Sequence, residues 1–261
     1  MIKTDYHIHT TFCDGKNSPE EMVLSAIEMG MEEMGFSVHG ITFYDKSYCI
    51  KCEKKPLYIE EIKALKEKYK DKIKIYLGVE SDYYSSEDVS MYDYVIGSVH
   101  YVKIEDEYVV VDSDAETMKK AADKYFGGDT LSFAERYYKV VADVVNKLNC
   151  DIIGHFNLLE KFQEKTTVFN TESERYKRAW RKAIDALIPS GIPFEVNTGA
   201  ISRGYRTVPY PSFEMIEYIK EKGGSVIFSS DSHAKDTIMY EFSKWEDKIR
   251  STGVKVVEKL R

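Results

Sequence analysis

Long apolar runs are missing from this sequence of 261 residues. No stretch approaches the roughly 20 consecutive apolar residues that span a bilayer, and the first five residues lack the apolar core of a secretion signal. Hydrophobic residues make up 43% of the chain and charged residues 31%, which is the balance of an ordinary globular protein. We therefore expect a cytoplasmic protein with no membrane partner.

Basic residues are outnumbered by acidic residues. Lys and Arg number 37 against 44 Asp and Glu, so the net charge is -7 at pH 7. Because a protein that binds a polyanion over a broad area needs a basic surface, we expect no nucleic-acid partner. A small phosphorylated substrate in a local basic pocket remains compatible with this charge. The composition indicates no particular oligomeric state.

Cysteine is scarce, with four residues in the chain: Cys13, Cys49, Cys52 and Cys150. Cys49 and Cys52 form a lone C-x-x-C pair. A structural zinc site normally needs a second such pair, and a redox site needs a thioredoxin-like context that Glu53-Lys54-Lys55-Pro56 does not provide. We therefore expect reduced thiols in a loop and no disulfide.

A phosphate-binding G-x-G-x-x-G loop is absent after every predicted strand, which argues against a doubly wound dinucleotide fold. Strands are predicted at residues 2–6, 33–37, 73–79, 94–99, 150–154, 193–196 and 225–229, with short extended pieces at 108–111 and 254–257. Helices are predicted between them, at 18–30, 59–69, 115–125, 133–148, 172–187, 212–221 and 237–251. Alternating strands and helices form parallel sheets through right-handed crossovers. The chain is therefore predicted to be one α/β domain, residues 1–261, with a TIM-like barrel.

Histidine is the residue type with an unusual distribution. Each of the six histidines lies at or just beyond the C-terminal end of a predicted strand: His7, His9, His39, His100, His155 and His233. Glu80 and Asp231 follow strands in the same way, and Asp14 lies beside the turn residue Gly15. A single histidine at such a place would be an ordinary loop residue, but the C-terminal strand ends of a parallel barrel share one rim, where barrel enzymes have their active sites. We therefore expect these side chains to form a metal centre.

Nine such ligands are too many for one ion, because zinc takes four or five ligands including solvent. They would serve two or three ions, with one carboxylate bridging a pair. Two ions roughly 3.5–4 Å apart can hold a phosphoryl group and supply a hydroxide at neutral pH. The ligand count therefore indicates more than one ion, an arrangement compatible with phosphate chemistry.

The motifs that carry these ligands resemble those of the PHP (polymerase and histidinol phosphatase) superfamily, in the same order along nearly the whole chain. They are Asp5-Tyr6-His7-Ile8-His9-Thr10, Gly35-Phe36-Ser37-Val38-His39, Gly78-Val79-Glu80, Ile96-Gly97-Ser98-Val99-His100, Ile153-Gly154-His155 and Ser230-Asp231-Ser232-His233. Glu195-Val196-Asn197-Thr198, with Arg203 and Tyr210-Pro211-Ser212, is similar to the histidinol-phosphatase branch.

This resemblance implies a distorted (β/α)7 barrel of the PHP type and a site for two to three divalent ions of zinc, manganese or iron. The implied ligands fall into three groups: His7, His9, Glu80 and Asp231 for the first ion, Glu80, His100 and His155 for the second, and His39, His233 and Asp14 for the third. Many relatives have a histidine at the position of Asp14. A harder oxygen ligand there would weaken the third ion or favour manganese or iron over zinc.

The resemblance also implies a reaction, the hydrolysis of L-histidinol phosphate to L-histidinol and phosphate in histidine biosynthesis. The alternative is another PHP phosphoesterase that acts on nucleotides or small phosphorylated metabolites. Two further alternatives are a nuclease, which the acidic balance disfavours, and a metal-binding scaffold with an inactive barrel, which the complete ligand set disfavours.

Charged residues outside the ligand set are assigned to the substrate. Arg203 is the first candidate to bind the phosphate, because a guanidinium can hold two oxygens at once, and Arg206 and Lys161 are second candidates. Asp231 is predicted to be essential for catalysis, and Asp14 or His233 to protonate the leaving alkoxide. The candidates for binding the imidazole and ammonium groups of the substrate are acidic or aromatic loop residues: Tyr101, Asp112 and Glu160.

Overall fold

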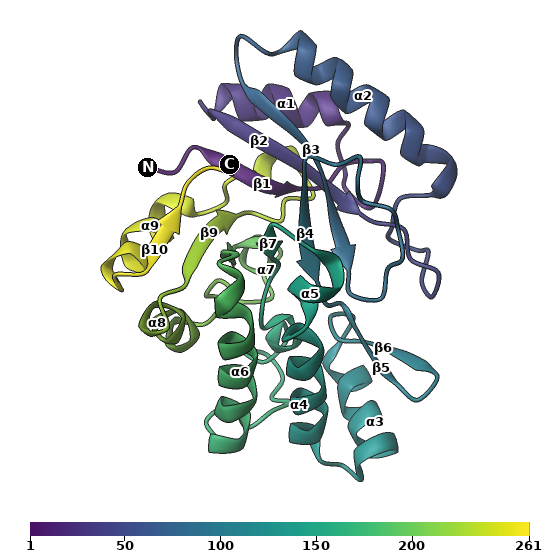
Figure 1. The fold of residues 1–261 in the computed structure, drawn as a ribbon, viewed down its shortest axis with the longest axis vertical. Helices are drawn as coiled ribbons and strands as arrows, with labels where there is room; N and C mark the ends of the chain where they lie inside the picture. The colour runs from purple at the N-terminus through teal and green to yellow at the C-terminus, as the bar shows by residue number, and fades with distance from the viewer. Residues whose placement is uncertain (261) are drawn as a thin grey trace.

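Parallel strands form one curled sheet in the computed structural model, which describes residues 1–260 (Figure 1). Its order is β1-β2-β3-β4-β7-β8-β9-β10. The strands are β1 (Thr4–Ile8), β2 (Glu33–His39), β3 (Lys74–Asp82), β4 (Tyr94–Ser98), β7 (Ile152–Ile153), β8 (Phe194–Asn197), β9 (Ser225–Ser229) and β10 (Lys255–Val257). Every neighbouring pair is parallel. The predicted α/β architecture with a distorted TIM-like barrel is confirmed.

The sheet curls until its first strand meets β9 at the C-terminal ends. Ile8 pairs with Ser232 in a parallel bridge, where His9 N donates to Ser232 O at 2.8 Å and Ser232 N donates to His7 O at 3.0 Å. At the opposite end β10 pairs with β9, and Leu260 N donates to the Tyr6 hydroxyl at 3.3 Å. The bridge brings the ends of β1 and β9, which are far apart in sequence, to the same place.

Helices cover the outer face of the sheet (Figure 1). They are α1 (Pro19–Glu28), α2 (Lys55–Lys68), α3 (Ala115–Phe126), α4 (Thr130–Val141), α5 (Val144–Leu148), α6 (Glu174–Leu187), α7 (Gly199–Ser202), α8 (Phe213–Glu221) and α9 (Phe242–Ser251). The start of α1 is encoded locally, because Ser18 and Glu21 form a capping box and Pro19 occupies the first turn. Helices cover the outer face of the sheet and packed side chains fill the space inside its curve. As a result, β1 and β2 are buried along their whole length.

Three predicted elements differ from the structure. The extended piece at 108–111 is the second strand of an antiparallel hairpin, β5 (Tyr101–Ile104) and β6 (Glu107–Val110). The predicted helix 133–148 is broken between α4 and α5, where Asp143 accepts a hydrogen bond from the Tyr83 hydroxyl at 2.8 Å. The last predicted helix starts five residues late, at Phe242, because Met239 N instead donates to Asp5 Oδ2 at 3.2 Å. In the last two cases a distant partner overrides the local pattern.

The four cysteines are free, as expected, with Cys49 buried and Cys52 exposed. Among residues 1–260, no helix combines the length and the apolar character that crossing a bilayer requires.

Candidate metal centre

The predicted ligands gather at the C-terminal rim of the barrel. His7 and His9 come from the end of β1, His39 and Glu80 from β2 and β3, and the remaining ligands follow other strands: His100 after β4, His155 after β7, and Asp231 and His233 after β9. Most of them line a cavity of about 190 Å³, while His7 and His9 are fully buried beneath it. The parallel strands therefore bring together residues that are more than 200 positions apart.

A first group of ligand atoms surrounds one point beneath the cavity floor. His7 Nε2 lies 3.1 Å from Glu80 Oε2 and 3.8 Å from Asp231 Oδ1. His9 Nε2 lies 3.6 Å and 3.3 Å from the same two atoms. A tetrahedral zinc ion with bonds of about 2.0–2.1 Å would hold its ligand atoms roughly 3.3 Å apart. The spacing fits an ion bound by these four side chains.

The hydrogen bonding of this group supports the same interpretation. His7 Nε2, His9 Nε2 and Glu80 Oε2 are buried and have no hydrogen-bond partner among residues 1–260. Buried polar atoms normally have a partner, and each orphaned one costs about 1–3 kcal/mol. A cation between these atoms would satisfy all three at once, so the residues present fit a metal ion.

A second group of ligand atoms uses the other oxygen of the same carboxylate. Glu80 Oε1 lies 2.8 Å from His155 Nε2 and 3.4 Å from His100 Nε2. The two oxygens of Glu80 therefore face different groups of imidazoles. This is the arrangement that a bridging carboxylate requires.

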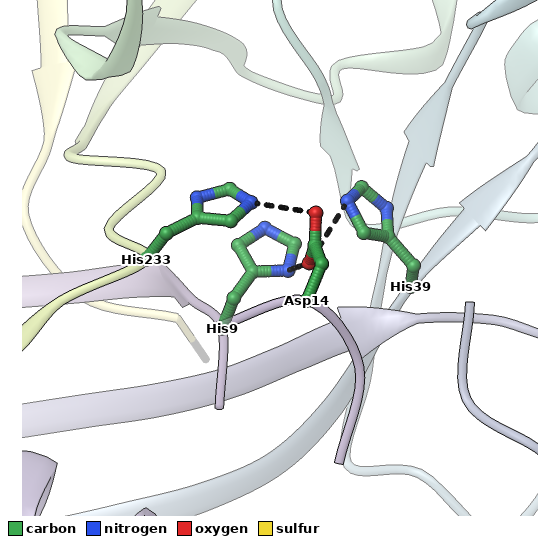
Figure 2. Close-up of side chains that lie close together, drawn as sticks. All are labelled: His9, Asp14, His39 and His233. Atoms are coloured by element: carbon green, nitrogen blue, oxygen red, sulfur yellow. Dashed lines mark ion pairs between the residues drawn. The ribbon is translucent and has the colours of Figure 1, made fainter. Parts of the chain in front are cut away.

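A third group surrounds Asp14 at the mouth of the cavity (Figure 2). Asp14 Oδ2 lies 3.3 Å from His233 Nε2, and Asp14 Oδ1 lies 3.7 Å from His39 Nε2 and 3.8 Å from His9 Nδ1. The Asp14 side chain is 36% exposed, whereas the Glu80 side chain is 1% exposed. A β-carbon on Gly15 would lie 2.5 Å from Thr10 N, so the tight turn that presents Asp14 needs glycine.

Two carboxylates that sequence reasoning did not assign to the site hold the imidazoles in place. Glu195 Oε1 lies 2.5 Å from His7 Nδ1, and Glu195 Oε2 accepts from His155 N at 2.7 Å. Asp82 Oδ2 accepts from His100 N at 2.8 Å and lies 3.4 Å from His100 Nδ1. The sequence did contain an indication of these two residues, since each is an acidic residue in a strand that is otherwise apolar. A carboxylate buried in such a strand needs a partner.

Opposite charges shift the pKa values across the cluster. Burial disfavours the charged form of Glu80, but the imidazoles of His7, His39 and His100 outweigh it and hold the pKa of the Glu80 carboxyl well below its usual range. Burial likewise disfavours protonated His100, but Glu80 and Asp82 outweigh it and raise its pKa to about 9. For His9 burial prevails, with His233 and His39 adding repulsion, and the pKa falls to about 3. The carboxylates are therefore poised to bind cations.

The three predicted phosphate-binding residues lie in different surroundings. Arg203 lines the cavity, and its Nη1 and Nη2 donate to Asp231 O at 2.8 Å and to Asp231 Oδ2 at 2.9 Å. Lys161 also lines the cavity, with Nζ 3.2 Å from Asp112 Oδ2. Arg206 is buried away from the cavity, where Nη1 donates to Glu160 O at 2.9 Å. Only Arg203 and Lys161 are placed to reach a bound anion.

Of the three residues predicted to bind the organic part of the substrate, two line a cavity and the third does not. Asp112 lines the cavity, and Tyr101 lines an adjoining one. Glu160 is buried and accepts from the Tyr176 hydroxyl at 2.6 Å, so it is already engaged. Sequence reasoning did not single out the Tyr210 side chain, whose buried hydroxyl lies at the cavity without a hydrogen-bond partner in the described chain.

Comparison with known proteins adds a family match and full-length relatives. The model of a family described as "PHP domain" matches residues 5–199. The "Probable histidinol-phosphatase" of Schizosaccharomyces pombe is 28% identical over 97% of this chain and 89% of its own length. The "Histidinol-phosphatase" of Bacillus subtilis is 26% identical over 93% of this chain and 97% of its own.

Solved structures show the same fold. A Listeria monocytogenes protein, solved as a candidate histidinol phosphatase, has a TM-score of 0.78 at 22% identity and covers 93% of this chain and 100% of its own. The histidinol phosphate phosphatase of Lactococcus lactis, solved with zinc, L-histidinol and phosphate, has a TM-score of 0.71 at 22% identity. It covers 98% of this chain and 95% of its own.

Proposed function

Because the chain belongs to the PHP domain family, we propose that it is a metal-dependent phosphate monoester hydrolase that converts L-histidinol phosphate to L-histidinol and phosphate. The observation that carries this proposal is the Glu80 carboxylate, whose two oxygens face separate groups of imidazoles at the floor of a cavity lined by Arg203 and Lys161. Support for the substrate comes from the relatives named histidinol-phosphatase, which align over nearly the whole chain.

The cofactor in this proposal is a set of two to three divalent ions of zinc, manganese or iron, held by the three groups of ligands. Such ions, when bound, polarise phosphoryl oxygens and lower the pKa of water. The first two groups are the more deeply buried and share Glu80, whereas the third group is partly exposed around Asp14. We expect the third ion to be the most weakly held.

The phosphate contacts in this proposal are made by side chains at the cavity wall. Arg203 is fixed by its two hydrogen bonds to Asp231, which leaves part of its guanidinium to donate to phosphate oxygens. Lys161 adds a second positive charge to the cavity wall, and the unpartnered Tyr210 hydroxyl can donate one further hydrogen bond. Arg206, engaged with Glu160, is assigned a structural role instead.

The leaving alkoxide is strongly basic and needs a proton. Burial disfavours ionised Asp14, but His39 and His233 outweigh it and hold the pKa of the Asp14 carboxyl well below its usual range, so Asp14 is a poor acid. His233 Nε2 lies 3.3 Å from Asp14 Oδ2, a separation at which an N–H at Nε2 can donate to the carboxylate. With two ions bound, the proton is therefore assigned to His233 Nε2, with Asp14 as its partner.

The remaining predictions extend the proposal. One sheet includes strands from Thr4 to Val257, which supports residues 1–261 acting as one domain. Cytoplasmic location and the absence of a nucleic-acid partner stay predictions from composition. The second candidate function is a PHP phosphoesterase for nucleotides or other small phosphorylated metabolites, which the same cluster of ligands would serve.

A substrate panel tests the proposal. Protein loaded with zinc, manganese or iron is assayed for phosphate release from L-histidinol phosphate, nucleoside monophosphates and sugar phosphates. We expect the highest kcat/KM for L-histidinol phosphate, and loss of all activity in Asp231→Asn, with the distant Asp88→Asn as the matched control. A clear preference for nucleotides would instead favour the second candidate function.

A further inference from the structure

A second cavity of about 210 Å³ adjoins the metal centre. It shares part of its wall with the first cavity, through Asp14, His39, His100 and Asp112. The rest of its wall comes from the loop after β2, with Asp45 and Tyr48, and from Tyr101 in the β5–β6 hairpin. Because the two cavities share a wall at the metal ligands, a monoester with its phosphate in the first can extend its organic part into the second.

The two cavities differ in their lysine and arginine residues. The basic side chains that line the first, Lys161 and Arg203, do not line the second. The second contains the carboxylates of Asp14, Asp45 and Asp112, of which Asp14 and Asp112 also line the first. Asp112 is paired with Lys161, but among residues 1–260 no lysine or arginine nitrogen lies within 4 Å of the Asp45 carboxylate. The second cavity therefore offers Asp45 as a carboxylate that can pair with a cationic ligand.

The Asp45 carboxylate is held in place by neutral donors. Its Oδ2 accepts from the Tyr101 hydroxyl at 2.6 Å, and its Oδ1 accepts from Ser47 N at 2.8 Å and Ser47 Oγ at 2.7 Å. Hydrogen bonds from neutral groups fix a carboxylate without cancelling its charge. Asp45 thus keeps a full negative charge in a defined position at the cavity.

Aromatic rings form the wall beside Asp45. The rings of Tyr48 and Tyr101 lie 6.3 Å apart at an interplanar angle of 22°, and Tyr44 packs edge-on against Tyr101 at 4.8 Å. The Tyr48 hydroxyl is buried and has no hydrogen-bond partner in the described part of the chain. Faces of tyrosine rings attract cations, so the rings of Tyr48 and Tyr101 suit a cation bound beside Asp45.

We propose that this second cavity is the specificity site, which binds the cationic organic part of the phosphate monoester through Asp45 and the rings of Tyr48 and Tyr101. The inference rests on the proposed phosphatase function. It goes beyond that function by assigning residues of this chain to the recognition of the ammonium group and the aromatic ring of the substrate. Uncharged and anionic organic groups, as in sugar phosphates and nucleotides, are disfavoured because they would leave Asp45 without a counter-ion.

Asp45→Asn tests this site, with Glu53→Gln as the matched control. Both changes remove one negative charge from the segment between β2 and α2, but Glu53 is exposed and lies outside the second cavity. The metal-loaded enzyme is assayed with L-histidinol phosphate and with p-nitrophenyl phosphate, which carries no cation. We expect the ratio of the two kcat/KM values to fall about tenfold in Asp45→Asn, the loss of one partly buried ion pair, and to stay at the wild-type value in Glu53→Gln.

Binding of L-histidinol to the metal-loaded protein, followed by calorimetry, gives a readout that does not depend on turnover. The dissociation constant should rise by the same factor in Asp45→Asn. An unchanged ratio together with an unchanged dissociation constant would overturn the specificity site. The wild-type enzyme could instead prefer another ammonium-bearing ester, such as phosphoethanolamine, and Asp45→Asn could lose that preference. This result would support the specificity site and rule out L-histidinol phosphate as the substrate.

Discussion

Glu195 Oε1 lies 2.5 Å from Nδ1 of His7, and both side chains are fully buried. Burial disfavours ionised Glu195, but His7 outweighs it and lowers the pKa of the Glu195 carboxyl, so the carboxylate accepts and His7 Nδ1 donates. In the neutral imidazole that would bind an ion, the lone pair would then be at Nε2, the atom that faces Glu80 and Asp231. Glu195 is therefore a positioning residue for the first ion.

Replacing Glu195 with Gln should weaken metal binding while preserving the fold. The amide oxygen can still accept from His7, but without the negative charge that makes the imidazole a stronger ligand. Loss of such a partner typically costs about 10–100-fold in metal affinity, which competition with a fluorescent chelator would measure. Glu33→Gln is the matched control, since Glu33 is a buried strand carboxylate that accepts from the Tyr6 hydroxyl at 2.6 Å. Equal affinities in the two variants would refute the role of Glu195.

Arg203 and Arg206 should respond differently to replacement by alanine. Arg203→Ala removes a cavity donor, and because a charged hydrogen bond contributes about 1.5–3 kcal/mol, we expect KM for the phosphate ester to rise roughly tenfold or more. Arg206→Ala leaves the buried Glu160 without its cation. We expect that variant to lose roughly 3 kcal/mol in the free energy of unfolding, with KM near the wild-type value. Steady-state kinetics and urea unfolding of both variants separate the two roles, and a KM unaffected by Arg203→Ala would remove Arg203 as the phosphate contact.

Tyr210→Phe should lower activity without lowering stability. In the described chain the buried Tyr210 hydroxyl has no partner, so removing it relieves an unsatisfied group. Burial, against the attraction of Arg206 and Arg203, raises the pKa of Tyr210 far above its usual range, so the phenol stays protonated and able to donate. We expect kcat/KM to fall about fivefold, for one lost neutral hydrogen bond, and the unfolding midpoint to stay or rise. A drop in stability with unchanged kinetics would show that the hydroxyl serves the fold alone.

The thiols should differ sharply in reactivity. Burial raises the pKa of Cys13 and of Cys150 to about 12, so neither forms appreciable thiolate at pH 8 or 9. Cys52 is exposed and should account for the fast reaction with a disulfide reagent. Cys52→Ser should remove that fast phase, and unfolding should expose the remaining thiols. Rapid labelling of Cys150 in the folded protein would contradict its buried position.

The sequence was sufficient to predict most strands and the gathering of the His, Asp and Glu side chains at one end of the sheet. The parallel-barrel pattern places every strand end on one rim, so His7 and His233 could be grouped without knowing any contact. The capping box at Ser18 and Glu21 likewise encodes the start of α1 within a few residues. Features determined by short-range geometry are readable from local sequence.

Contacts between distant residues could not be predicted in the same way. Glu195 and His7 are 188 positions apart, and only the folded barrel shows that they meet. The break between α4 and α5 depends on Tyr83, and the engagement of Arg206 depends on Glu160. Each of these features follows from a tertiary partner for which the local residue pattern carries no signal.

Phosphate release from L-histidinol phosphate by chelated and reloaded protein tests the central claim most directly. We expect protein stripped of metal by a strong chelator to be inactive. Activity should return in proportion to added zinc, manganese or iron until the metal sites formed by the imidazole and carboxylate groups around Glu80 are occupied. Full activity in the stripped protein, or no phosphate release with any of these metals, would contradict the account.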